Sequence, residues 1–311
     1  MNAPARIISL LPAATEMVCA LGGVARLVGR SHECDFPPAA LRAPVVTAAN
    51  LDSNQSSAVI NEAVAGQLAT GQSLYHLEAA HLRALRPDLI LTQAQCAVCA
   101  VSPADVDAAL ADWSGPRPIV LTLAPVRFAD LWSDLRRVGA ALGLPDEGRA
   151  VVAQLKARVV AVIERTALVK RKPGLAALEW LDPLMGAGNW IPELVELAGG
   201  HPLFGEAGKH SDWLTWENLV LQDPEVLLAL PCGFNMARTK QELTVLAQKP
   251  EWLQLRAVKS RRVFVADGNA YFNRPGPRLV DSLEILAEVL HPELFASPQH
   301  LGSGWEPWPA V

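Results

Sequence analysis

Short apolar runs alternate with helix-like patterns along the chain, and the same order occurs twice. In the first half, an apolar run, a proline, a helical pattern and two glycines fill residues 7–23, and a strand-like segment follows at 84–93. In the second half, segments 175–180, 191–200 and 221–233 repeat this order. Alternating strands and helices are typical of α/β folds with parallel sheets. The repeat therefore predicts two similar Rossmann-like lobes with a ligand cleft between them.

A long helical pattern separates the two halves. Apolar residues recur at helical spacing across 146–170, Asp146 can cap the start, and Pro173 and Gly174 stop the pattern. A single helix is a stiff connection, so we expect small closure motions of the lobes. The expected parts are an N-terminal α/β lobe (1–144), a connecting helix (145–172), a C-terminal α/β lobe (173–290) and an irregular tail (291–311).

The composition indicates a globular protein that does not bind nucleic acid. Hydrophobic residues make up 50% of the 311 residues and charged residues 19%, and the formal net charge is −5. Nucleic-acid binding needs clustered Lys and Arg, and the chain has no basic tract. No apolar run approaches the roughly 20 residues of a membrane-spanning helix.

The first residues of the chain bear on the expected cellular location of the protein. The first strand pattern starts at Ile7, without the basic segment and long apolar stretch of a secretory signal. We therefore expect a cytoplasmic protein, with a periplasmic location as the alternative if a leader has been removed. Five cysteines are an odd number, which does not indicate a secreted disulfide framework.

Polar and aromatic residues follow the predicted strands. In open α/β sheets, ligands bind beyond the carboxyl ends of the strands, so these loops are expected to form the site. The chain has nine Trp and two Tyr, and a cluster of aromatic rings suits a flat or greasy ligand. The residues expected to bind the ligand are His32, Glu33, Gln93, Gln95, Glu179, Trp180, Trp213, Phe234, Tyr271, Phe272 and Arg274. For loop 32–35 a second interpretation stays open, a solvated loop, which the two prolines after it support.

Four of the five cysteines also follow predicted strands. They are Cys34, Cys96, Cys99 and Cys232. The spacing of Cys96 and Cys99 is typical of metal ligands, and thiolates with a neighbouring histidine suit zinc, iron or copper. The cysteines therefore predict a site for a metal ion, or for the metal centre of a chelate. The alternative is four reduced thiols that line a pocket for an organic ligand as small hydrophobic groups.

The string RIISLLPAATEMVCALGGVARLVGRS resembles the opening of substrate-binding proteins of ABC importers with a single-helix backbone, which serve cobalamin, haem and ferric siderophores. The strings ALRPDLIL, LVELAGG and RPGPRLVDSLEIL match as well, and the resemblance covers essentially the whole chain. The cobalamin-binding type is the most similar branch. The resemblance implies two lobes, each a small parallel sheet flanked by helices, joined by one long helix. It also implies membrane subunits of an ABC importer as partners.

Two departures from the family pattern change the picture. Family members dock on the transporter through one glutamate on each lobe. Glu196 matches the position in the second lobe, whereas Ala80 stands at the position in the first lobe, with Glu78 nearby. We therefore expect weak or absent coupling to a transporter. Cobalamin-binding members have tryptophan where this chain has QAQCAVC, which indicates a branch with a changed ligand or an intracellular role.

Two functions follow from these observations. The first is a non-enzymatic binding protein for cobalamin, another corrinoid or a related metal chelate, held in the cleft. The second is a cytoplasmic metal- or thiol-dependent enzyme, or a metal-binding protein, built on the same scaffold, because a fold does not determine a function. The polar loop 32–35 and Glu179 support the second function. The sequence shows no recognisable set of catalytic residues, which favours the first.

Overall fold

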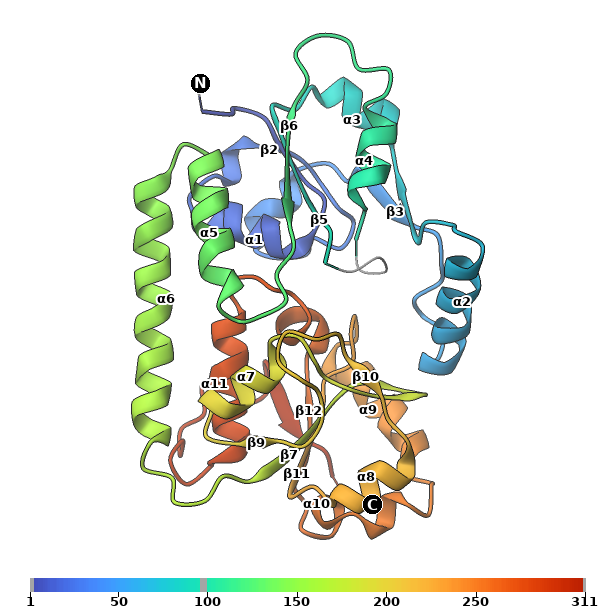
Figure 1. Cartoon of the computed structure of the whole chain (residues 1–311), viewed down its shortest axis with the longest axis vertical. Coiled ribbons are helices and arrows are strands. Elements are labelled where there is room, and N and C mark those ends of the chain that lie inside the picture. The colour runs from blue at the N-terminus through green and yellow to red at the C-terminus, as the bar shows by residue number, and fades with distance from the viewer. Residues whose placement is uncertain (1–2, 96–99, 310–311) are drawn as a thin grey trace. The chain divides into compact units, whose positions relative to one another are not determined.

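The computed structural model describes residues 3–95 and 100–309, and they form two compact units (Figure 1). The units are described separately. The first comprises residues 1–55, 62–125 and 129–154, and the second comprises 56–61, 126–128 and 155–311. Within the described residues, none of the helices has the length and apolar character that crossing a membrane requires.

The first unit contains a parallel four-stranded sheet in the order β2-β1-β5-β6. Its strands are β1 (Ile7–Ser9), β2 (Leu27–Arg30), β5 (Leu89–Gln93) and β6 (Ile119–Leu123). A separate antiparallel pair, β3 (Thr47–Ala49) and β4 (Tyr75–Leu77), lies beyond β2 in the chain. Every residue of β1 and β5 is buried, because helices cover both faces of the sheet.

The helices of the first unit provide the covering layers. They are α1 (Pro12–Ala20), α2 (Ser57–Ala69, of which 62–69 belong to this unit), α3 (Ala79–Leu85), α4 (Pro103–Ala109), α5 (Asp130–Ala141) and the short turns η1 (Val24–Arg26) and η2 (Pro38–Arg42). One core cluster joins alternate residues of the central strands, Ile8 and Ile90, to Leu82 of α3 and Val106 of α4. Side chains alternate across a strand, so the other residues of β1 and β5 face the opposite side of the sheet.

The second unit has a larger, mixed sheet in the order β10-β8-β7-β11-β12-β13, with β9 also paired to β7. Its strands are β7 (Gly174–Leu181), β8 (Leu184–Gly186), β9 (His201–Pro202), β10 (Asp212–Trp213), β11 (Val226–Ala229), β12 (Val263–Ala266) and β13 (Trp305–Pro307). The central pairs β7–β11 and β11–β12 are parallel. Antiparallel strands occupy both edges of the sheet.

Helices pack on both faces of the second sheet. They are α7 (Ile191–Leu197), α8 (Trp216–Gln222), α9 (Met236–Leu246), α10 (Arg256–Lys259), α11 (Leu279–Leu290), η3 (Trp252–Gln254) and the single π turn η4 (Gly268–Phe272). Leu178, Leu227 and Val265 share one core cluster with Leu243 of α9 and Trp252. The helix α6 (Pro145–Thr166) belongs to the first unit up to Gln154 and to the second from Leu155.

The double glycines in the two halves end their helices with the same geometry. The N–H of Gly22 and of Gly199 each donates to the carbonyl three residues back, at 3.0 and 3.1 Å. The N–H of Gly23 and of Gly200 each donates to the carbonyl five residues back, at 2.8 and 2.9 Å. Gly22 and Gly199 both have a φ of +79°, a left-handed conformation that glycine adopts without strain.

The Pro-Asp and Pro-Glu segments also correspond in the two units. Arg86 and Asp223 end the preceding helices with φ values of 42° and 41°. The carboxylate of Asp88 accepts two backbone N–H groups just before β1, at 2.9 and 3.0 Å, and Glu225 accepts the N–H of Gly174 at 3.3 Å. The sequence repeat therefore corresponds to a structural repeat, which confirms the prediction of an α/β fold with parallel sheets in two lobes.

The tail differs from the expected irregular segment. Residues 305–307 form β13, which pairs with β12 and covers the edge of the sheet. Trp305 donates from Nε1 to Glu288 Oε2 at 2.7 Å, and its ring lies edge-on to Phe264 at 5.5 Å. Pairing with β12 and burial of Trp305 stabilise the tail. Its proline-rich composition alone predicted an irregular segment. The connecting helix is also shorter than expected and ends at Thr166.

Candidate functional site

In the first unit, polar side chains meet at the carboxyl end of β2. They are Ser31, His32, Glu33, Thr47 and Tyr75, here called the His32 cluster. The hydroxyl oxygen of Thr47 lies 2.7 Å from His32 Nδ1 and accepts the backbone N–H of His32 at 3.0 Å. The same hydroxyl donates to Ser31 Oγ at 3.1 Å. The pair of strands β3–β4 supplies both Thr47 and Tyr75, so secondary structure holds the cluster in place.

An aromatic ring and a carboxylate complete the His32 cluster. The Tyr75 hydroxyl donates to Glu33 Oε1 at 3.1 Å, and the rings of His32 and Tyr75 lie 5.8 Å apart. Burial lowers the pKa of His32 below its usual value, and the charge of nearby Arg30 lowers it further. Both effects favour the neutral form of the imidazole.

The glutamines that follow β5 are placed differently from each other. Gln93 is buried at the end of the strand, and its side-chain oxygen accepts the backbone N–H of Gln95 at 2.9 Å. Gln95 is partly exposed. The amide of Gln93 therefore shapes the turn after β5, and Gln95 is the better placed of the two to meet a ligand.

The structure describes two of the four cysteines that were predicted to bind a metal, because Cys96 and Cys99 lie outside the described residues. Cys34 is fully buried, and Thr15 Oγ1 donates to its sulfur at 3.0 Å. Cys232 is exposed and belongs to the second unit. The Cys34 sulfur also lies 4.0 Å from the carbonyl oxygen of Ser9, the last residue of β1. The metal assignment for Cys34, Cys96, Cys99 and Cys232 stays a prediction.

In the second unit, an aromatic and cationic group forms where β7 and β11 end. It comprises Glu179, Trp180, Ser211, Phe234 and Arg238, here called the Trp180 cluster. The rings of Trp180 and Phe234 lie 5.2 Å apart, and the Arg238 guanidinium carbon lies 3.9 Å from the Phe234 centroid. Phe234 is 3% exposed, whereas Trp180 and Arg238 are partly exposed. Phe234 thus supports a surface that Trp180 and Arg238 present.

The Glu179 carboxyl group is enclosed, although part of the residue reaches solvent. Ser211 Oγ donates to Glu179 Oε2 at 2.8 Å, and the N–H of Gly188 donates to Ser211 Oγ at 2.9 Å. Burial raises the pKa of Glu179, and the hydrogen bond from Ser211 offsets only part of that effect. The carboxyl group therefore holds its proton to higher pH than an exposed glutamate does.

The segment after β12 contains three further residues that were predicted to bind the ligand: Tyr271, Phe272 and Arg274. The guanidinium of Arg274, 7% exposed, donates to Asn269 Oδ1 at 2.9 Å. Arg278 lies over the Tyr271 ring at 5.4 Å, and Tyr271 is partly exposed. Phe272 is fully buried, so its ring belongs to the core and not to a ligand surface. A Cβ at Gly268 would lie 2.2 Å from the Pro231 carbonyl oxygen, so only glycine allows this close approach of chain segments.

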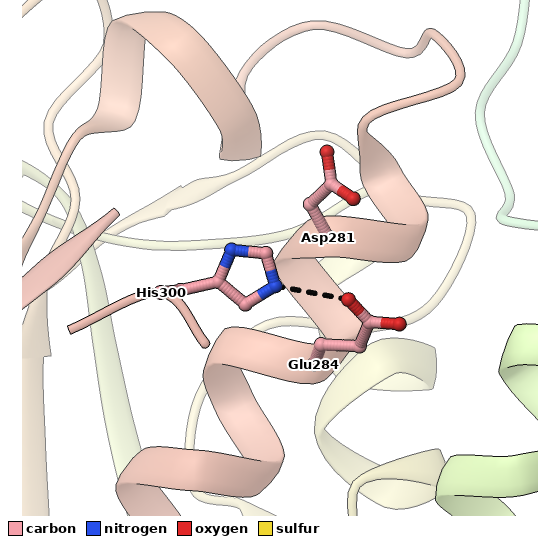
Figure 2. Close-up of side chains that lie close together, drawn as sticks. All are labelled: Asp281, Glu284 and His300. Carbon is pink, nitrogen blue, oxygen red and sulfur yellow. Dashed lines mark hydrogen bonds and ion pairs between the residues drawn. The ribbon is translucent and has the colours of Figure 1, made fainter. Parts of the chain in front are cut away.

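One group of metal-type side chains occurs among the described residues, and none of its members was predicted to bind a metal. Figure 2 shows Asp281 and Glu284 on α11 beside His300 of the tail, and their ligand atoms lie within 4.8 Å of one another. The guanidinium of Arg158, on α6, forms ion pairs with both carboxylates, including one of 2.6 Å to Glu284 Oε2. A cation already lies between the acids, so we interpret this group as an ion-pair network that joins α6, α11 and the tail.

The ion-pair network shifts the protonation of its members. Burial disfavours the imidazolium of His300, but its 2.9 Å contact with Glu284 and the surrounding acids outweigh this and raise its pKa. Burial also disfavours the Glu284 carboxylate, but hydrogen bonds from His300 and Arg158 outweigh it and lower the pKa of Glu284. Both shifts favour the charged pair.

The structure brings together some predicted residues and adds others. His32 and Glu33 lie in the His32 cluster, and Glu179, Trp180 and Phe234 lie in the Trp180 cluster; that they bind a ligand stays a prediction. Trp213 lies on the edge strand β10 and is 56% exposed. The sequence did not predict four residues of the two clusters: Thr47, Tyr75, Ser211 and Arg238. A signal existed for Arg238, because Asn235 caps α9 and Arg238 occupies its first turn next to Phe234. The local sequence around Thr47 and Ser211 gives no such signal.

Comparison with known proteins decides the family. The model of the family described as "Periplasmic binding protein" matches residues 7–270. The chain belongs to this family. A curated relative is the uncharacterized ABC transporter substrate-binding lipoprotein YvrC of Bacillus subtilis, 21% identical over 94% of this chain and 82% of that protein. A periplasmic heme-binding protein of Pseudomonas aeruginosa superposes with a TM-score of 0.69, at 22% identity and 93% coverage of both chains. The periplasmic vitamin B12-binding protein BtuF of Vibrio cholerae gives a TM-score of 0.65, at 18% identity over 93% of this chain and 97% of that chain.

Membership of the periplasmic binding protein family corrects the expected location. The similar proteins are described as periplasmic, or as a lipoprotein, and are therefore extracytoplasmic. The expectation of a cytoplasmic protein is wrong, because it relied on the residues in front of the first strand and not on the family. Membership also favours ligand binding over the enzymatic alternative.

Proposed function

We propose that this periplasmic binding protein is the substrate-binding component of an ABC importer and binds a metal chelate with a flat macrocycle, a corrinoid or a haem. The Trp180 cluster carries the proposal. The partly exposed indole of Trp180 and the partly exposed guanidinium of Arg238 both lie against the buried phenyl ring of Phe234. Such a surface stacks on a planar conjugated ring and attracts its acidic substituents. The names of the heme- and B12-binding proteins of similar fold support the same ligand class.

The second unit combines this stacking surface with neighbours that suit a large polar ligand. Glu179, directly before Trp180, is partly exposed, and burial of its carboxyl group raises its pKa. In the segment after β12, the partly exposed Arg278 lies over the Tyr271 ring and provides positive charge. A chelate with acidic or amide side chains would satisfy these groups.

Docking on a transporter forms part of the proposal. Glu196, on α7, is exposed. Glu78 is also exposed and precedes α3, with its carboxylate 3.3 Å from His76. Because Ala80 stands at the position where the family resemblance expects the first-lobe glutamate, we expect weak coupling. Reconstituted transport that depends on both glutamates would contradict that expectation.

The proposed ligand class is tested by titrating the purified protein with hemin, with aquacobalamin and with diaquacobinamide, followed by absorbance. We expect saturable binding of at least one chelate by the whole chain. Trp180→Ala should weaken binding by about tenfold or more, because stacking and burial of an indole contribute over ~1.4 kcal/mol. Leu221→Ala, at a 79% exposed position on α8, is the matched surface control. Absence of binding at millimolar chelate would overturn the proposal.

A further inference from the structure

A hollow of about 370 Å³ lies in the first unit, at the end of α3 that precedes β5. The end of α3 contributes Arg83, Ala84 and Arg86 to its lining, and the loop after α4 contributes Trp113 and Ser114. This volume is in the range of small-molecule sites. None of these residues was predicted from the sequence to bind a ligand, so the hollow is a candidate for a second site.

The two arginines of this hollow carry charges that no acid of the described chain neutralises. Arg83 is partly exposed and donates one hydrogen bond, from its guanidinium to the carbonyl oxygen of Ala109 at 3.3 Å. Arg86 is exposed. Within the part of the chain that the structure describes, neither forms an ion pair, whereas Arg117, on the loop after α4, pairs with Asp107 at 2.9 Å. Two guanidinium charges that line one hollow favour an anion between them.

The second unit shows how a charged residue at the corresponding helix end is used when its role is structural. Asp223 ends α8 in the same left-handed conformation as Arg86 ends α3. The Asp223 carboxylate accepts the backbone N–H of Arg256 at 2.8 Å, and the Arg256 guanidinium donates to the Asp223 carbonyl oxygen at 2.9 Å. At α3, the guanidinium of Arg6 donates to the carbonyl oxygen of Leu85 at 2.8 Å. Because Arg6 satisfies that carbonyl group, the Arg86 guanidinium is not needed for it.

From these observations we propose that the hollow binds a phosphate group, of a small molecule or of a lipid headgroup, between Arg83 and Arg86. A phosphate has enough oxygens to accept hydrogen bonds from two guanidinium groups at once, whereas the two oxygens of a carboxylate match one guanidinium. Trp113 is partly exposed, and its Nε1–H donates to the carbonyl oxygen of Pro116 at 2.8 Å. The indole therefore offers its ring to the nonpolar part of the bound molecule. This site lies within the first unit and does not rest on the proposed function.

Titration of the whole chain with pyrophosphate, at constant ionic strength, tests the site. The indole N–H signal of Trp113 in nitrogen-15 spectra reports on the hollow directly. This signal should shift saturably in the wild type and in Arg117→Gln, the matched control, whose arginine is paired with Asp107. Arg86→Gln and Arg83→Gln should each weaken binding by about tenfold, because each removes the charge-assisted hydrogen bonds of one guanidinium. Melting temperatures near that of the wild type would show that both variants are folded.

Vesicles distinguish the two sources of the phosphate group. Sedimentation with vesicles of phosphatidylglycerol and phosphatidylcholine, which pyrophosphate prevents and Arg86→Gln abolishes, would identify a lipid headgroup. Binding of pyrophosphate without binding to these vesicles would identify a phosphorylated small molecule. A Trp113 signal that does not respond to pyrophosphate, or equal affinity of the wild type and Arg86→Gln, would overturn the proposal. None of these results depends on whether the protein binds a chelate.

Discussion

The helix ends at Gly22 and at Gly199 share one backbone geometry but have different surroundings. A Cβ at Gly22 would meet no atom within 4 Å, whereas a Cβ at Gly199 would lie 3.0 Å from both Thr166 and His291. The strand ends differ still more. The His32 cluster is polar and linked by hydroxyl groups, and the Trp180 cluster is aromatic and cationic. The two units thus repeat a scaffold, while the loops that the scaffold carries have separate chemistry.

The two helix-ending glycines should respond differently to substitution, and one of them should give the largest loss of stability predicted here. Gly199→Ala should lower the free energy of unfolding by about 3 kcal/mol, because left-handed strain and a close contact act together. Gly22→Ala should cost about 1 kcal/mol, since only the strain applies. Urea denaturation of the two variants measures the difference. Equal losses would show that the surroundings of Gly199 adjust without cost.

The ion-pair network is a feature of the second unit that should respond to loss of its cation. Arg158→Met should lower the free energy of unfolding by about 1 to 2 kcal/mol, because two partly buried carboxylates lose their counter-ion. Arg149→Met removes an exposed pair on the same helix and should cost under about 0.5 kcal/mol.

Removal of Arg158 also tests how we interpret Asp281, Glu284 and His300. The ligand atoms of these three side chains lie within 4.8 Å of one another, close enough to share a metal ion once the guanidinium is gone. Zinc should therefore raise the melting temperature of Arg158→Met and leave that of the wild type unchanged. Equal stabilisation of both proteins would contradict the view that Arg158 is the cation of the network.

Substitution of Arg238 should change ligand affinity less than the substitutions above change stability. It tests whether Arg238 contributes charge to the ligand site or packs on Phe234. Arg238→Gln should weaken binding of hemin by about threefold to tenfold, because one cation is lost next to the acidic groups of the ligand. The same variant should bind diaquacobinamide, whose side chains are amides, with little change. An equal loss for both chelates would indicate that Arg238 acts through packing on Phe234 and not through charge.

The smallest expected effect is the pH dependence that His300 contributes to stability. Its pKa is raised in the folded protein, so its stabilising charge is fully present below the ordinary value of 6.5 and is lost as the pH rises through the raised value. Glu284 acts in the opposite direction, and its contribution is lost as the pH falls below its ordinary value of 4.5. Unfolding of wild type and His300→Gln at about pH 6 and about pH 9 should give a steeper loss for the wild type. Parallel curves would assign the alkaline loss to other groups.

Much of the scaffold follows from local patterns in the sequence. Buried strands such as β5 appear as apolar runs, α5 appears as an amphipathic repeat, and the double glycines mark helix ends. These features depend on residues close together in the chain, so the sequence predicts them. The short antiparallel strands β3, β8 and β13 were not predicted, because two- and three-residue pairings leave no period in the sequence.

The sequence by itself determined the order of strands and helices, the repeat of two α/β lobes and the loops that carry polar and aromatic residues. Only the tertiary structure decided that Thr47 contacts His32, that Ser211 contacts Glu179 and that Cys34 is buried. The reason is physical. Period and propensity record which face of an element is buried, whereas a contact between loops distant in sequence depends on how whole strands pair, and short-range patterns do not record it.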